Sequence, residues 1–234
     1  SSVRCHLRCF MAWSGVCTEE LVAVFSGQLC SYIRSAAAHD DRLASFSEAL
    51  GEATKPWAGQ HYHKELPKLR APACRHLDDA AQRMRSGRHP LGAPLEPLLK
   101  RLHWSAGEGA LASRTASANL LTAPDIHVGV GLTAPRTQSS LHVVPADELY
   151  VPLSCTLWEQ NLALIVKSPY GQQPHVVGSV VAWAGMEPHG MVTSEAPLLF
   201  VWIRHGDLSR GPQRHDADSA VGTPCVESET LTRS

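Results

Sequence analysis

The chain has 234 residues, of which 44% are hydrophobic and 18% are charged. This length fits one large domain or a core domain with an appendage, and the composition excludes a chain that is disordered throughout. The 21 Lys and Arg residues nearly balance the 22 Asp and Glu residues, so the basic excess of a nucleic-acid-binding protein is missing. The longest apolar runs, such as Ala196–Ile203, are too short to span a bilayer. We therefore expect neither a nucleic-acid partner nor a membrane segment.

The first hundred residues have the pattern of amphipathic helices, with apolar side chains at intervals of three and four. Asp40 and Asp41 are suited to cap the second helix, and Ser86–Gly87 is suited to end the third. The pattern predicts helices at Glu19–Ala38, Arg42–Ala53, Arg75–Arg85 and Pro97–Trp104.

After Gly107 the sequence changes to short runs rich in β-formers, separated by Pro and Gly. Runs of this length and spacing predict an antiparallel sandwich or barrel. We expect three parts: a helical region over residues 1–112, a β-barrel over 113–208, and a disordered polar tail over 209–234. The predicted strands are Asn119–Thr122, Ile126–Leu132, Leu141–Val144, Glu148–Leu153, Leu162–Lys167, His175–Trp183 and Leu198–Arg204.

The cysteine pattern does not decide whether the protein belongs to a reducing or an oxidising cellular compartment. There are seven, an odd number, without a CxxC pair, and four of them lie in the first thirty residues. A small N-terminal disulfide patch and the free thiols of a reducing compartment both fit; we favour free thiols and expect a cytoplasmic protein.

The segment Leu141–Leu153 (LHVVPADELYVPL) contains the most informative polar residues. In an extended strand, His142, Glu148 and Tyr150 lie on the same face, because side chains alternate between faces. Pro145 is suited to a β-bulge, which would move His142 to the opposite face of the strand from Glu148. Burying these polar groups in an apolar barrel is unfavourable unless they bind something or pair with one another. Both readings stay open: a ligand site, and a structural hydrogen-bonded network.

A third candidate is His189, which follows Pro188 and precedes the apolar strand at Leu198. A lone histidine in a turn is usually solvated. With His142 and Glu148, however, it completes a set of two histidines and one carboxylate, which occupies one side of a divalent metal and leaves positions for substrate and water. A weaker candidate is His61-x-His63 with Glu65, which lies outside the predicted barrel.

These motifs resemble the cupin superfamily, and within it the cupin-type dimethylsulfoniopropionate (DMSP) lyases. That family has a strand of the form HxHPAEELY, an LSG turn and a Trp, and then a PHAM-T motif leading into a PLL-x-W-x-GDL strand. The similarity covers roughly residues 40–208, and only the two motifs are specific. The first motif matches His142, Pro145, Ala146, Glu148, Leu149, Tyr150, Leu153–Ser154 and Trp158. The second matches Pro188, His189, Met191, Thr193, Pro197–Leu199, Trp202 and Gly206–Leu208.

The resemblance implies an all-β cupin barrel (a double-stranded β-helix, or jelly roll) with an N-terminal helical extension. It also implies a divalent metal ion, Fe, Zn or Mn, held by His142, Glu148 and His189. The family has a fourth ligand, a second histidine, where this chain has Val144. Loss of one ligand weakens metal affinity, although three ligands still define a site.

The chemistry that the resemblance implies is a β-elimination, in which DMSP gives dimethyl sulfide and acrylate. Tyr150 matches the family's base, and its phenol pKa of about 10 has to fall for that role. The substrate is a small sulfonium carboxylate, and aromatic rings are suited to its fixed positive charge. Trp158, Trp183 and Trp202 are the candidates for that contact.

Two other functions stay open. The chain fits a non-catalytic cupin paralogue that acts as a binding or structural module, since Val144 replaces a ligand. It also fits another cupin activity on a small carboxylate. A homodimer is an open alternative for its oligomeric state.

Overall fold

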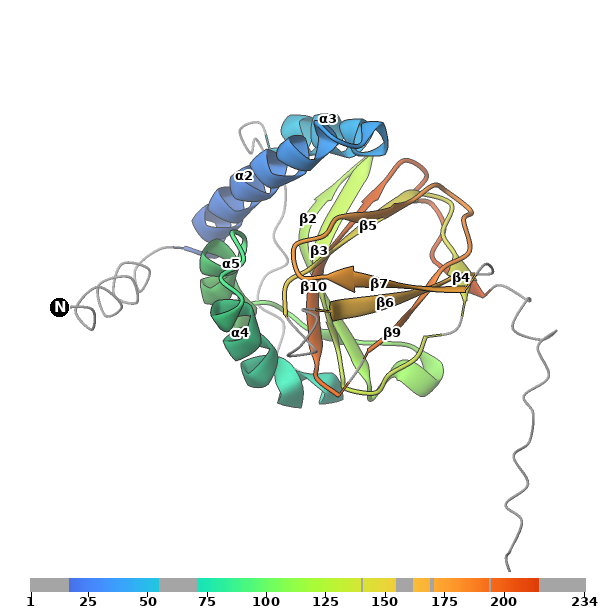
Figure 1. The fold of residues 1–234 in the computed structure, drawn as a ribbon. Helices are drawn as coiled ribbons and strands as arrows, with labels where there is room; N and C mark the ends of the chain where they lie inside the picture. The colour runs from blue at the N-terminus through green and yellow to red at the C-terminus, as the bar shows by residue number, and fades with distance from the viewer. Residues whose placement is uncertain are drawn as a thin grey trace, which may run out of the picture.

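The computed structural model describes residues 17–54, 71–139, 141–154, 162–168, 171–193 and 195–214. The described helices lie on one side of the β region (Figure 1). They are α2 (Thr18–Ala37), α3 (Ala44–Ala53), α4 (Leu77–Ser86) and α5 (Gly92–Leu99), with 3-10 turns at Asp41–Leu43, Pro72–His76 and Gly109–Leu111. None of the described helices is both long and apolar enough to cross a membrane.

Three of the four helices confirm the predicted positions. As predicted, Asp40 caps the second helical segment: its carboxylate accepts the backbone N–H of Arg42 at 3.1 Å. The fourth prediction, Pro97–Trp104, was wrong, because α5 begins at Gly92 and ends at Leu99. Pro94 lies in the first turn of α5, where a backbone N–H needs no partner within the helix, so the chain turns helical before Pro97.

The described strands form three antiparallel sheets. The largest has the order β1-β2-β3-β10-β5-β8, the second β7-β6-β9, and the third β11-β4. The strands are β1 (Ser105–Ala106), β2 (Thr115–Ala123), β3 (Ile126–Thr133), β4 (His142–Val143), β5 (Asp147–Pro152), β6 (Leu162–Ser168), β7 (Gly171–Val176), β8 (Val181–Trp183), β9 (Gly190–Val192), β10 (Leu198–His205) and β11 (Gln213–Arg214). The closure of these sheets into a barrel stays a prediction.

The strand predictions need four corrections. The run His175–Trp183 is two strands, β7 and β8, because Gly178 has a φ of +83° and turns the chain between them. The run Leu141–Val144 shortens to β4, and the β region begins at β1, before residue 113. Gln213 pairs with Val143 in β11, so the predicted tail contains a strand, and residues 215–234 lie outside the described part.

The two faces of the six-stranded sheet have different partners. On one face, Leu149 and Val151 of β5 belong to a core that also contains Phe25 and Leu29 of α2. On the other face, Tyr150 packs with Trp183 and Phe200 in a second, smaller cluster. The helices therefore cover one face of the sheet, and the face that carries Tyr150 is turned away from them.

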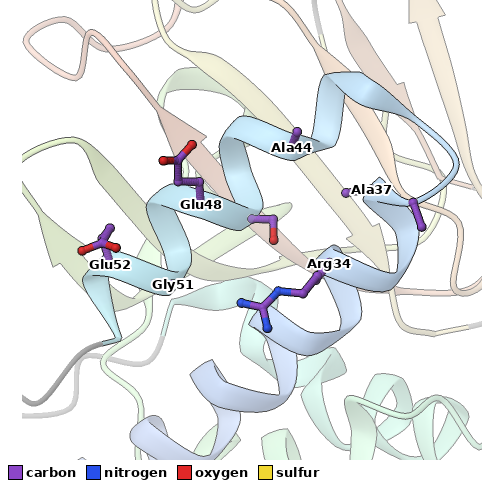
Figure 2. Close-up of a pocket in the computed structure, with 8 residues that line it drawn as sticks. Arg34, Ala37, Ala44, Glu48, Gly51 and Glu52 are labelled. Carbon is purple, nitrogen blue, oxygen red and sulfur yellow. The ribbon is translucent and has the colours of Figure 1, made fainter.

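A cleft of about 570 Å³ lies between α2 and α3. Arg34 and Glu48 are among the residues that line it, together with the small residues Ala37 and Gly51 (Figure 2). This cleft is part of the helical layer and contains none of the predicted site residues.

The helical layer contacts the β region through a buried histidine. His89 follows α4, and its ring lies 5.2 Å from that of Tyr32 in α2. The Tyr32 hydroxyl donates a hydrogen bond to the carbonyl of Gly178, in the turn between β7 and β8. His89 Nδ1 accepts the backbone N–H of Leu91 at 3.1 Å. Because Nδ1 is an acceptor here, His89 is neutral, and burial lowers its pKa to about 4.

We predict that His89→Asn reduces the pH dependence of stability. The unfolded histidine takes up a proton near its usual pKa of 6.5, whereas the folded one does so only near 4. The free energy of unfolding therefore falls as the pH drops through this window, by at most about 1.4 kcal/mol per pH unit. An asparagine Oδ1 replaces the Nδ1 acceptor but does not titrate. Urea unfolding at about pH 7 and about pH 5 measures the effect. If the free energy of unfolding falls equally between about pH 7 and about pH 5 in the wild-type and His89→Asn proteins, the prediction is wrong.

Candidate metal centre

Three predicted ligands from separate segments meet in the structure. His142 comes from β4, Glu148 from β5, and His189 from the end of the loop that joins β8 to β9. One ligand atom from each side chain lies within 4.8 Å of the others. Glu148 and His189 are 1% and 2% exposed. The prediction that these side chains converge is confirmed; that they bind a metal ion stays a prediction.

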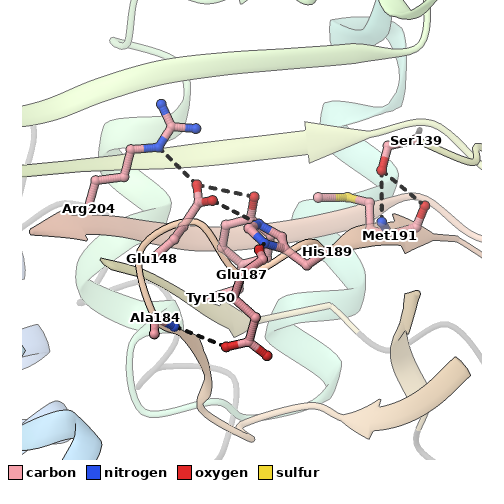
Figure 3. Close-up of polar contacts among 8 residues, drawn as sticks. All are labelled: Ser139, Glu148, Tyr150, Ala184, Glu187, His189, Met191 and Arg204. Atoms are coloured by element: carbon pink, nitrogen blue, oxygen red, sulfur yellow. Dashed lines mark hydrogen bonds and ion pairs between the residues drawn. The ribbon is translucent and has the colours of Figure 1, made fainter. Parts of the chain in front are cut away.

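Glu148 is the centre of this cluster (Figure 3). Its Oε2 lies 2.9 Å from Nε2 of His189. Its Oε1 accepts the Nε–H of Arg204 at 2.9 Å and the hydroxyl of Tyr150 at 3.3 Å. Oε1 therefore accepts hydrogen bonds from Arg204 and Tyr150, and Oε2 faces His189.

The carboxyl group of Glu148 is ionised in this setting. Burial by itself raises the pKa of Glu148, but the hydrogen bond to His189 and the positive charges of Arg204, His189 and His142 outweigh that effect and lower the pKa to about 2. Arg204 and Glu148 face each other across β10 and β5, so sheet register fixes this ion pair.

The ring of His189 is held at both nitrogens. Nδ1 lies 2.9 Å from the carbonyl oxygen of Glu187, and Nε2 lies 2.9 Å from Glu148 Oε2. A carbonyl oxygen only accepts, so Nδ1 must carry a proton. Oε2 of the ionised Glu148 also only accepts, so Nε2 donates a proton to it. Nε2 is the atom that would face a metal ion once this proton is given up, and a carbonyl behind a ligating histidine is a common support for a metal site.

The loop from Ala184 to Pro188 is fixed against the chain that precedes β5. Gly185 N–H donates to Asp147 at 2.8 Å, and Met186 N–H donates to the carbonyl of Val144 at 2.7 Å. A Cβ at position 185 would lie 2.3 Å from the carbonyl oxygen of Pro145, so only glycine fits here. Two backbone hydrogen bonds, at 2.9 and 3.0 Å, then join His189 to His142.

Aromatic rings surround the cluster. Trp183 stacks on His189, with ring centroids 4.3 Å apart and planes at 10°. Tyr150 lies edge-on to Trp183 at 4.9 Å and tilted to Phe200 at 4.9 Å. Burial and then the negative charge of Glu148 raise the pKa of Tyr150 well above 10. The Tyr150 hydroxyl is therefore a neutral hydrogen-bond donor in the metal-free protein.

The tryptophans predicted to contact substrate have different positions. Trp183 lies against His189, as described, and Trp202 lies beneath the guanidinium of Arg204, whose Cζ is 5.4 Å from the ring centroid. Trp158 and the His61–Glu65 candidate lie outside the described residues. Val144, at the place of the family's fourth ligand, is buried with 2% exposure.

Sequence reasoning missed Arg204 and Glu187. The alternation of β10 contained a signal for Arg204, because it places this charged residue on the same inward face as Trp202. The contribution of Glu187 is a backbone carbonyl oxygen, which the side-chain pattern does not report.

The donor set fits a divalent transition metal. Two imidazoles and one carboxylate suit iron, zinc and manganese, and two histidines with one carboxylate on one side of the ion leave other positions open. The carbonyl of Glu187 holds Nδ1 of the buried His189, so Nε2 is the nitrogen that faces the other two residues. His142, Glu148 and His189 are therefore the residues that would hold the ion.

Comparison with known proteins gives a structural match. No protein-family model and no curated protein matches the sequence. A structure reported among "crystal structures of DMSP lyases RdDddP and RnDddQII" matches with a TM-score of 0.55 at 17% identity, over 83% of this chain and 99% of that one. The DMSP lyase DddQ from Ruegeria pomeroyi DSS-3 matches with a TM-score of 0.53 at 16% identity, over 82% and 96%.

The fold resembles that of the two DMSP lyase structures. A cupin domain from Bordetella pertussis matches a shorter part, 39% of this chain and 93% of that one, at 16% identity and a TM-score of 0.33. The two lyase structures match 83% and 82% of this chain, so the shared fold includes the helical layer as well as the sheets.

We predict that Zn²⁺, Mn²⁺ or Fe²⁺ raises the melting temperature of this protein and that a chelator reverses the effect. An ion at a hundred times its dissociation constant stabilises a protein by about 2.7 kcal/mol. Glu148→Gln removes the central charge and should abolish the shift. The matched control is Glu195→Gln, which removes the same charge from an exposed pair with Arg136. A shift that survives Glu148→Gln would contradict this site.

Proposed function

We propose that this chain is a metal-dependent carbon–sulfur lyase that converts DMSP to dimethyl sulfide and acrylate. The observation that carries the proposal is the convergence of His142, Glu148 and His189 next to Tyr150, in a fold that two DMSP lyase structures share. The lyase activity is proposed from this convergence, since identities of 16% and 17% indicate the fold alone.

The reaction needs a base and a place for negative charge. A proton leaves the carbon next to the substrate carboxylate, the carbon–sulfur bond breaks, and its electron pair departs with the sulfur as neutral dimethyl sulfide. A bound divalent ion supplies positive charge for the carboxylate oxygens, where negative charge develops in the transition state. His142, Glu148 and His189 would hold that ion.

Tyr150 is the proposed base. Its hydroxyl already donates to Glu148 Oε1, and its pKa is raised as long as the carboxylate is its nearest charge. Positive charge added to the cluster lowers that pKa and favours the phenolate. In its protonated form the Tyr150 hydroxyl is oriented by its hydrogen bond to Glu148, and the rings of Trp183 and Phe200 pack against the phenol ring.

A second candidate function is a non-catalytic cupin that binds a ligand. Two observations favour it: Val144 is buried where the family has a ligand, and all three partners of Glu148 are already in place without an ion. Purified protein that retains no metal after reconstitution with iron, zinc or manganese would favour this function.

We predict that the metal-loaded protein releases dimethyl sulfide from DMSP and that Tyr150→Phe slows release at least about a hundredfold, the lower range for a general base. Headspace gas chromatography measures the product. Phenylalanine keeps the ring contacts with Trp183 and Phe200 and removes only the hydroxyl, so the two proteins are compared at equal metal content. Equal rates for both proteins would refute Tyr150 as the base.

We predict that Val144→His strengthens metal binding and raises the rate of dimethyl sulfide release. The substitution restores the imidazole that the family motif has at this position, and a fourth ligand increases affinity. Isothermal titration with Zn²⁺ and the headspace assay measure the two effects. Val144→Leu is the control, because it changes volume without adding a ligand. Equal behaviour of the histidine and leucine variants would contradict the assignment.

A further inference from the structure

Arg204 is a charged group at the cluster whose side chain is also partly open to solvent. Its side chain is 26% exposed, whereas that of Glu148, its partner, is 1% exposed. Its Nε–H is used by Glu148 Oε1. In the described part of the chain, neither Nη atom has a hydrogen-bond partner. The outer edge of the guanidinium is therefore available to a ligand.

The guanidinium is held in a fixed position on two sides. Glu148 binds its Nε, and the ring of Trp202 lies beneath its Cζ. Trp202 itself lies close over Gly129, where an added Cβ would come within 2.2 Å of the indole. A guanidinium anchored in this way loses little further freedom on binding, and its two Nη groups match the two oxygens of a carboxylate.

Arg204 also lies close to the proposed base. Arg204 Nε and the Tyr150 hydroxyl both bind Glu148 Oε1, at 2.9 and 3.3 Å (Figure 3). They are separated by no more than the sum of these two contacts. An acid whose carboxylate lies on the Nη groups can therefore bring the adjacent carbon toward the Tyr150 oxygen.

We propose that Arg204 is a substrate-binding residue that receives the carboxylate of a small organic acid. This proposal rests on the proposed function, since that reaction acts on a carboxylate substrate. Arg204 then supplies a cation at a site that lacks the family's fourth metal ligand. A fixed guanidinium repels a sulfonium, so it also orients DMSP with its carboxylate toward Arg204 and its sulfur away.

The test uses metal-free protein and propionate as the probe, so that neither a metal ion nor turnover is needed. In wild-type protein labelled with ¹⁵N-arginine, propionate should shift the Nε–H resonance of Arg204, which the Arg204→Lys variant assigns by its absence. Propionamide has the same shape without the charge and should cause no shift. Equal shifts with both compounds would overturn the proposal.

Two variants with the same loss of charge separate this site from general electrostatics. Arg204→Met should weaken propionate binding about tenfold or more, the effect of losing charge-assisted hydrogen bonds. Arg136→Met removes an exposed guanidinium that pairs with Glu195 and should leave binding unchanged. Unchanged binding in Arg204→Met would overturn the proposal. If that variant fails to fold, the wild-type comparison of propionate with propionamide decides.

The outcome is distinguishable from failure of the proposed function. Arg204-dependent propionate binding in a protein that releases no dimethyl sulfide would leave this inference standing and refute the lyase. Release of dimethyl sulfide with an unchanged KM in Arg204→Met would keep the lyase and refute the role of Arg204. A raised KM with a similar kcat is the expected result, because the residue binds the substrate's carboxylate.

Discussion

The buried carboxylate of Glu148 is the constraint on which the arrangement of this protein depends. An ionised carboxylate with 1% exposure is unfavourable unless other groups replace its hydration. Here an imidazole, a guanidinium and a phenol do so, and each comes from a fixed place: His189 from a loop, Arg204 from the neighbouring strand, and Tyr150 from two residues along the same strand. Removing one partner leaves the charge partly unpaired, so these residues act as a unit.

This unit depends on contacts on both faces of the sheet. The helices pack on one face of β5 through Leu149 and Val151, which holds the alternate residues of that strand toward the cluster. The loop before His189 is fixed by Gly185, whose hydrogen bond to Asp147 connects it to the start of β5. The site is thus set by sheet register and backbone hydrogen bonds, and the partly exposed side chain of Arg204 lies at its edge.

The sequence was sufficient to predict the helical and β-rich halves and the convergence of His142, Glu148 and His189, since alternation in β5 and the spacing of two short motifs are local properties. The sequence was insufficient where contacts between distant parts of the chain determine the local structure. The turn at Gly178 depends on backbone conformation, and the strand β9 is too short to show a periodic pattern. Arg204 was overlooked because a charge at a strand end resembles a solvated residue until register places it opposite Glu148.

X-ray absorption spectroscopy of the protein reconstituted with Zn²⁺ tests most directly whether this cluster is a metal centre. The account predicts stoichiometric zinc with two imidazoles and one carboxylate oxygen among its ligands, and loss of one imidazole's multiple-scattering signal in His189→Ala. Zinc bound through sulfur, or a spectrum that His189→Ala leaves unchanged, would contradict the account and leave Glu148 as the centre of a purely structural network.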